Sequence, residues 1–198
     1  MSTSVDLNAY RRFFAEEIQM VSNLRTPGLV DALATVPRER FLPPGPWVVR
    51  GDADFMAPLR RTPSDDPRHV YHNVAIGIDP ERMLFNGAPG LLSTGIDALG
   101  LDVGKRVLHI GTGAGYYTAV MAQTVGHMGH VCGIEVDSNL AKTAAANLAT
   151  MHGSICARAT AARRWTGCSM RSSSMPASRI LNHSGCRHLH RAAASTCR

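Results

Sequence analysis

The sequence predicts an α/β fold: a doubly wound, mostly parallel, Rossmann-like sheet, truncated here to its first strands and preceded by an N-terminal helical cap. An apolar run that contains Val107, Leu108 and Ile110 leads directly into a glycine-rich loop. A helix-like segment follows, and then a second apolar run at 131–136. This order is typical of the strand–loop–helix–strand unit of nucleotide-binding sheets, so we expect strands near 106–110 and 131–136 to be parallel neighbours.

The glycine loop and the acid that follows it suggest a ligand of the nucleoside type. Gly111, Gly113 and Gly115 allow a tight turn and a close approach of the backbone to a ligand. Glu135 ends the second apolar run, where a carboxylate can accept hydrogen bonds from ribose hydroxyls. A dinucleotide-binding loop would have glycine or alanine at position 116, which is a bulky tyrosine here. The alternative is a tight strand–helix turn that holds no ligand.

The cap and its connections are expected to be helical and then irregular. Residues 7–22 fit a helix whose apolar face carries Phe13, Phe14, Ile18 and Val21. A second helix starts after Thr26, with proline in its first turn, and stops before Pro37. The polar stretch 48–75 is expected to be a loop-rich excursion.

Two further helices flank the predicted strands. Residues 89–99 place Leu92, Ile96 and Leu99 at helical spacing, and a glycine at position 100 stops the helix. The second of these helices is expected over 138–149, with either Asp137 or Ser138 as its capping residue. We therefore divide the chain into a cap (1–80), the first part of the sheet domain (81–150) and a tail (151–198).

Charge and cysteine content also change at the boundary between the sheet domain and the tail, near residue 151. Residues 151–198 hold eight arginines and no acidic residue, whereas the rest holds 13 basic and 15 acidic residues. Four of the five cysteines also lie in the tail, without the spacing of a zinc site or a disulfide framework. No apolar run reaches the length of a membrane span and the N-terminus is not a secretory signal, so a cytoplasmic location is expected.

Three motifs in a fixed order resemble one enzyme family. VPRERFLPP (36–44) is followed by LDVGKRVLHIGTGAGYYTAVMAQ (101–123) and GIEVD (133–137). This order is similar to that of the protein-L-isoaspartate O-methyltransferases, which typically show VPRE-F-P and then VLEIGTGSGY. The resemblance implies transfer of a methyl group from S-adenosylmethionine to a peptide or small-molecule carboxylate. It also implies a set of cofactor-binding residues: Gly111, Thr112, Gly113, Gly115, Tyr116 and Glu135. We expect no metal, no nucleic acid and no membrane partner.

The chain departs from the family where the acceptor is expected to bind. MLFNGAP (83–89) stands where the family has its GQTISQP segment, so Gly87 replaces the active-site serine. Losing a hydrogen bond to a charged group costs roughly 1.5–3 kcal/mol. Asn86 or Ser93 are candidate substitutes, and His109 stands where the family has glutamate. The catalytic residues therefore remain unassigned. A non-catalytic nucleoside-binding module and a nicotinamide-dependent oxidoreductase are the alternative functions.

The tail has the composition of a GC-rich gene read out of frame. If the last base of each codon is joined to the first two of the next, the codons from Trp165 onward permit DGLFDAIFVNAGVTHPEPLWL. FDAIFV matches the fourth-strand motif of the family, and residues 158–161 permit its GDG loop. We therefore hypothesise a frameshift near 150–157, which sequencing of the DNA tests. The rivals are an Arg-rich segment that binds nucleic acid and a metal site at Cys186, His188 and His190. With the tail out of frame, we expect it to be irregular, the helices 89–99 and 138–149 to lack cover, and methyl transfer to fail.

Overall fold

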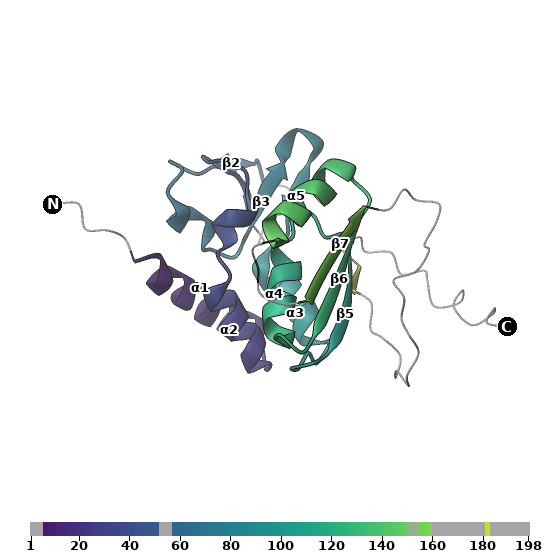
Figure 1. Cartoon of the computed structure of the whole chain (residues 1–198). Helices are drawn as coiled ribbons and strands as arrows, with labels where there is room; N and C mark the ends of the chain where they lie inside the picture. The colour runs from purple at the N-terminus through teal and green to yellow at the C-terminus, as the bar shows by residue number, and fades with distance from the viewer. Residues whose placement is uncertain (1–5, 52–56, 150, 152–153, 160–180, 183–198) are drawn as a thin grey trace.

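A computed structural model describes residues 6–51, 57–149, 151, 154–159 and 181–182 of the 198-residue chain. A parallel sheet forms the half that follows residue 100, with strands in the order β7-β6-β5-β8. Its strands are β5 (Arg106–Ile110), β6 (His130–Glu135), β7 (Ser154–Ala159) and β8 (Leu181–Asn182). β5 and β6 pair in parallel over five residues, and the helix α4 (Tyr116–Val125) connects them. The predicted α/β class and the predicted strand pair are confirmed (Figure 1).

A second, antiparallel sheet precedes the parallel one, in the order β2-β1-β3-β4. It consists of β1 (Val48–Gly51), β2 (Arg60–Arg61), β3 (Val74–Asp79) and β4 (Leu84–Asn86). The expectation of an irregular excursion over 48–75 is therefore wrong at β1, β2 and the start of β3. The boundary expected at residue 80 falls between β3 and β4, which pair with each other. Two single-turn 3-10 helices, η2 (Pro67–Val70) and η3 (Pro80–Arg82), connect its strands.

The N-terminal helices form at the expected places, but one of them buries a different face. α1 (Leu7–Ser22) packs on α2 (Pro27–Thr35), and α2 in turn packs on α4, as Figure 1 shows. The buried residues of α1 are Phe14, Ala15 and Ile18, whereas Phe13 and Val21 are more than 60% exposed. The predicted apolar face is therefore rotated, because the positions of α2 and of Tyr71, which stacks edge-on against Phe14, decide which residues face inward. The 3-10 helix η1 (Arg38–Phe41) follows α2.

The helices expected to lack cover are covered. In α3 (Pro89–Asp97), Leu92 and Ile96 are buried, and in α5 (Ser138–Leu148), Ala144 and Leu148 are buried. β7 supplies part of this cover, because α5 packs on it and Ile155 packs against the core. The expectation of uncovered apolar faces is wrong for these residues.

The tail contains structure within its described residues. β7 pairs in parallel with β6 over six residues, and β8 pairs in parallel with the end of β5. The expectation of an irregular tail is therefore wrong for 154–159 and 181–182, where backbone pairing to an existing strand edge needs no particular side chains. The proposed metal ligands Cys186, His188 and His190 lie outside the described residues. No helix in the described part of the chain is long and apolar enough to span a membrane.

Candidate cofactor and acceptor site

The glycine loop joins β5 to α4 at the carboxyl edge of the parallel sheet. Its first two N–H groups, those of Gly111 and Thr112, donate to the carbonyl oxygen of Ile134 on β6, at 2.8 and 3.1 Å. Gly113 and Gly115 adopt positive φ angles of +58° and +102°, which L side chains rarely adopt. At Gly115, which caps α4, a Cβ would also lie 3.2 Å from Cγ of Leu148. The sequence therefore needs glycine at both positions.

Glu135 lies at the end of β6 with its carboxylate turned onto this loop. Its Oε2 accepts a hydrogen bond from the Gly113 N–H at 2.7 Å, and its Oε1 accepts from the Asp137 N–H at 3.0 Å. The residue is 7% exposed. Each carboxylate oxygen keeps capacity to accept a second hydrogen bond, so this group can both fix the loop and bind a donor of a ligand.

Asp137 holds the next helix and links the two sheets. Its carboxylate caps α5 by accepting hydrogen bonds from the N–H groups of Asn139 and Leu140, at 2.9 and 3.0 Å. The guanidinium of Arg82, from the connection between β3 and β4, forms an ion pair with the same carboxylate. The Leu140 N–H and the Arg82 guanidinium hold the pKa of Asp137 below its usual value. The loop after β6 is thereby fixed relative to β4.

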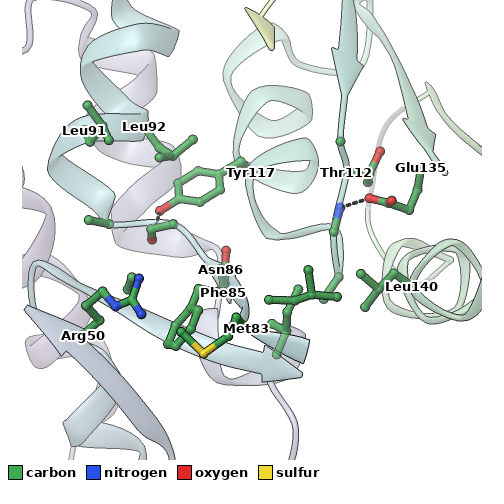
Figure 2. A pocket seen from close by; sticks show the side chains of 18 of the residues that line it. Arg50, Met83, Phe85, Asn86, Leu91, Leu92, Thr112, Tyr117, Glu135 and Leu140 are labelled. Atoms are coloured by element: carbon green, nitrogen blue, oxygen red, sulfur yellow. Dashed lines mark hydrogen bonds between the residues drawn. The ribbon is translucent and has the colours of Figure 1, made fainter. Parts of the chain in front are cut away.

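A cavity of about 460 Å³ opens between the glycine loop and the 83–88 segment. Figure 2 shows the two sides: Thr112, Glu135 and Leu140 on one, and Arg50, Phe85 and Leu91 on the other. Tyr117, from the first turn of α4, bridges them, because its hydroxyl donates to the carbonyl oxygen of Gly87 at 3.1 Å (Figure 2). Burial raises the pKa of Tyr117 to about 12. The Tyr117 hydroxyl therefore stays protonated at neutral pH, and its hydrogen bond fixes its position.

Four of the six residues predicted to bind a cofactor line this cavity: Gly111, Thr112, Gly113 and Glu135. Thr112 is 5% exposed, and its Oγ1 has no hydrogen-bond partner among the described residues. Gly115 lies behind the loop, against α5. Tyr116 points into the core, where it is 1% exposed and its ring stacks edge-on against Phe41 at 5.7 Å. Position 116 is thus a contact between the cap and the sheet.

Of the candidate residues on the acceptor side, one lines the cavity and two do not. Asn86 lines the cavity, whereas Ser93 is fully buried in α3 and does not line it. His109 is 2% exposed, and its Nδ1 lies 2.8 Å from Oγ1 of Thr118 on α4. This histidine is a buried residue of β5, and it does not line the cavity. The Nδ2 atom of Asn86 has no hydrogen-bond partner within the described part of the chain.

Arg38, of the VPRERF motif, holds the acceptor side of the cavity from behind. It is fully buried, and its guanidinium donates to five carbonyl oxygens. These belong to Val70 (2.7 Å), His72 (3.1 Å), Val74 (2.9 Å), Asn86 (3.4 Å) and Gly87 (3.4 Å). Arg38 therefore holds the 70–74 and 86–87 segments together, and it is a positioning residue.

Sequence reasoning missed Arg50, Ile78 and Tyr117 as cavity residues. Arg50 and Ile78 lie on β1 and β3, whose short strands gave no alternation long enough to detect. A signal existed only for Tyr117, because the first turn of a helix after a glycine loop faces the ligand of such sheets.

Comparison with known proteins identifies the fold and the family. The family model for protein-L-isoaspartate(D-aspartate) O-methyltransferase matches residues 60–163. The chain belongs to this family. A protein-L-isoaspartate O-methyltransferase of Methanothrix thermoacetophila is 31% identical over 66% of this chain and 52% of that protein. One of Rhodopseudomonas palustris is 34% identical over 71% of this chain and 46% of that protein.

Solved structures agree with this assignment. A protein-L-isoaspartate O-methyltransferase structure superposes with a TM-score of 0.56 at 25% identity, over 74% of this chain and 42% of that one. A putative family member from Plasmodium falciparum, solved in complex with S-adenosyl-L-homocysteine, shares the fold with a TM-score of 0.50 at 17% identity, over 70% of this chain and 54% of that one. The chain spans about half the length of the curated relatives it matches. Family membership favours the methyltransferase interpretation over a nicotinamide-dependent oxidoreductase.

Proposed function

We propose that this chain carries the glycine-loop half of an S-adenosylmethionine site and the adjoining acceptor pocket of a carboxylate O-methyltransferase. The observation that carries the proposal is the buried Glu135 carboxylate, which accepts from Gly113 and faces the same cavity as Thr112. A ribose presents hydroxyl donors that match the remaining acceptor capacity of this carboxylate. The side-chain-free Gly113 leaves room for close approach of the ligand.

The protein's part in the reaction is positioning. The cofactor supplies a methyl group on a sulfonium: a carboxylate oxygen forms the new O–C bond while the S–C bond breaks with its electron pair going to sulfur, which leaves a methyl ester and a neutral thioether. Glu135 and the glycine loop would hold the donor, and Asn86 lines the acceptor side of the cavity. Because no proton is transferred, orientation and exclusion of water lower the barrier rather than acid–base catalysis.

We further propose that the chain as written binds this cofactor weakly, because its adenine side is incomplete. The acidic loop is expected at 158–161, which reads RATA and offers no carboxylate, although the first two of these residues form the end of β7. A restored reading frame after about residue 155 would supply an acid there. The peptide or small-molecule carboxylate acceptor and the cytoplasmic location are likewise proposals, which rest on the family relationship and on the sequence.

Transfer of a labelled methyl group tests the proposal. The frame-restored chain is expected to methylate an isoaspartyl peptide, and Glu135→Gln should reduce cofactor affinity by roughly tenfold or more, since one charge-assisted contact is lost. Glu16→Gln, the same change at an exposed position on α1, is the matched control and should leave affinity unchanged. Cofactor binding without any methyl transfer to carboxylates would favour the non-catalytic module, which the loss of the serine at position 87 also favours.

A further inference from the structure

The part of the cavity that lies away from the glycine loop combines an apolar wall with one cationic group. Its apolar lining comes from Met83, Leu84, Phe85, Leu91 and Leu92. Among the described residues that line the cavity, Arg50 is the only cationic side chain. Its guanidinium lies over the ring of Phe85, 4.9 Å from the centroid, which fixes its orientation. Figure 2 shows Arg50 and Glu135 at opposite ends of the cavity.

The strand register gives the separation between Arg50 and the glycine loop. Arg50 pairs with Ala75 of β3. At the other end of this strand, a Cβ on Gly113 would lie 3.6 Å from Cδ1 of Ile78, so the glycine loop contacts β3 there. Ala75 and Ile78 are three residues apart, which corresponds to about 10 Å along an extended strand. The backbone of Arg50 and the glycine loop therefore contact β3 at two points about 10 Å apart along the strand.

A cation at the far end of the cavity suits binding rather than the chemical step. Methyl transfer from a sulfonium to a carboxylate cancels a positive and a negative charge in the transition state. A guanidinium in contact with the reacting carboxylate would stabilise the charged ground state more than the transition state, and would slow the reaction. At the far end of an apolar wall, the same guanidinium can bind an anionic group that does not react.

We propose that Arg50 is a specificity-determining residue, which binds a second anionic group of the methyl acceptor at the end of the cavity opposite Glu135 (Figure 2). This inference rests on the proposed function of the same cavity. The acceptor then carries two anionic groups that are joined by an apolar body. This chemistry is found in a peptide with an acidic residue about three positions from an isoaspartyl residue, or in an extended aliphatic dicarboxylate.

Equilibrium binding of two labelled peptides to the 198-residue chain tests the inference. The peptides contain one isoaspartyl residue and differ only in glutamate or glutamine about three positions away. The glutamate peptide is expected to bind roughly tenfold more tightly. Arg50→Gln should remove this preference without changing affinity for the glutamine peptide, whose binding reports that the variant is folded. Arg60→Gln is the matched control, because Arg60 is exposed on the neighbouring strand β2, and should retain the preference.

The outcomes separate this inference from the proposed function. Equal binding of the two peptides, no binding of either, or a preference that survives Arg50→Gln would overturn it. Titration of the frame-restored chain with S-adenosylhomocysteine addresses the function: cofactor binding by this chain without a peptide preference refutes only the role of Arg50, and a peptide preference without cofactor binding by this chain refutes only the function. Competition by sebacate distinguishes a peptide acceptor from a free dicarboxylate acceptor. Tighter binding of this dicarboxylate than of the glutamate peptide indicates a free dicarboxylate acceptor.

Discussion

Replacing Arg38 by methionine would remove the most highly connected buried cation of the described structure while keeping a long, flexible side chain. Three of its five hydrogen bonds, to the carbonyl oxygens of Val70, His72 and Val74, are between 2.7 and 3.1 Å. The other two, to the 86–87 segment, are 3.4 Å long and weak. The variant leaves these buried carbonyl groups without their donor, and the neighbouring rings of Phe14 and Tyr116 lose a cation about 6 Å away.

The expected loss is about 3–5 kcal/mol in the free energy of unfolding. Each buried acceptor left unsatisfied costs about 1–3 kcal/mol, and removal of one partner from a buried charged network costs about 3–5 kcal/mol in other proteins. The summed cost of the three acceptors that lose a short hydrogen bond is partly offset, because the variant no longer has to bury a charged guanidinium. Such a loss is a large share of the roughly 5–15 kcal/mol available to a domain.

Urea denaturation followed by far-ultraviolet circular dichroism measures this loss. With a slope of about 2 kcal/mol per molar, the midpoint should fall by about 2 M. Arg12→Met, at an exposed position on α1, is the control and should shift the midpoint by no more than about 0.3 M. A loss below about 1 kcal/mol for Arg38→Met would refute the view that this residue ties the cap to the acceptor segment.

Three other predictions follow from backbone geometry and titration. Gly115→Ala should destabilise the chain by about 1–3 kcal/mol in urea denaturation, because φ is +102° and the added Cβ would press on Leu148; a neutral effect would contradict this geometry. Burial opposes ionisation of Asp97, but hydrogen bonds from the Thr26 side chain and from the backbone N–H groups of Thr26 (2.8 Å) and Arg25 (3.0 Å) hold its pKa below the usual value. Its contribution should therefore be present above the unfolded-state pKa and be lost as pH falls through the lower folded-state pKa, and Asp97→Asn should show a smaller fall in melting temperature over that acid range. Burial raises the pKa of Tyr117 to about 12, so its stabilising contribution is complete below about pH 10 and is lost as pH rises from about 10 to 12. Tyr117→Phe should show a smaller alkaline loss of stability over that range than the parent chain, and an unchanged alkaline loss would contradict a buried, protonated hydroxyl.

The sequence predicted the parts of the fold that depend on neighbouring residues. β5, the glycine loop, α4 and β6 form one continuous unit, so their periodicity and glycine positions were enough to place Glu135 beside Gly113. The capping residue before α5 and the proline that opens α2 are also local signals, and both helices begin where expected, although the Thr26 side chain makes no capping hydrogen bond.

The missed parts depend on contacts between distant segments. β1, β3 and β4 are three to six residues long, and their pairing brings Arg50 to the cavity from far along the chain. No local pattern encodes such pairing. The inward face of α1 was also misjudged, because several apolar residues lie on both sides of that helix and tertiary packing selects Phe14 and Ile18. The strand β7 forms although the sequence of the tail lacks a strand pattern, since the edge of β6 provides its backbone partners.

Calorimetric titration of S-adenosylhomocysteine tests the central claim, that Glu135 and the glycine loop form a cofactor site whose adenine side is missing in the chain as written. Two chains are compared: the 198-residue chain, and one with the reading frame restored after about residue 155. We expect saturable binding to the restored chain and weak or undetectable binding to the chain as written. Glu135→Gln in the restored chain should lower the affinity by roughly tenfold or more. Equally tight binding to both chains, or binding that Glu135→Gln leaves unchanged, would contradict the account.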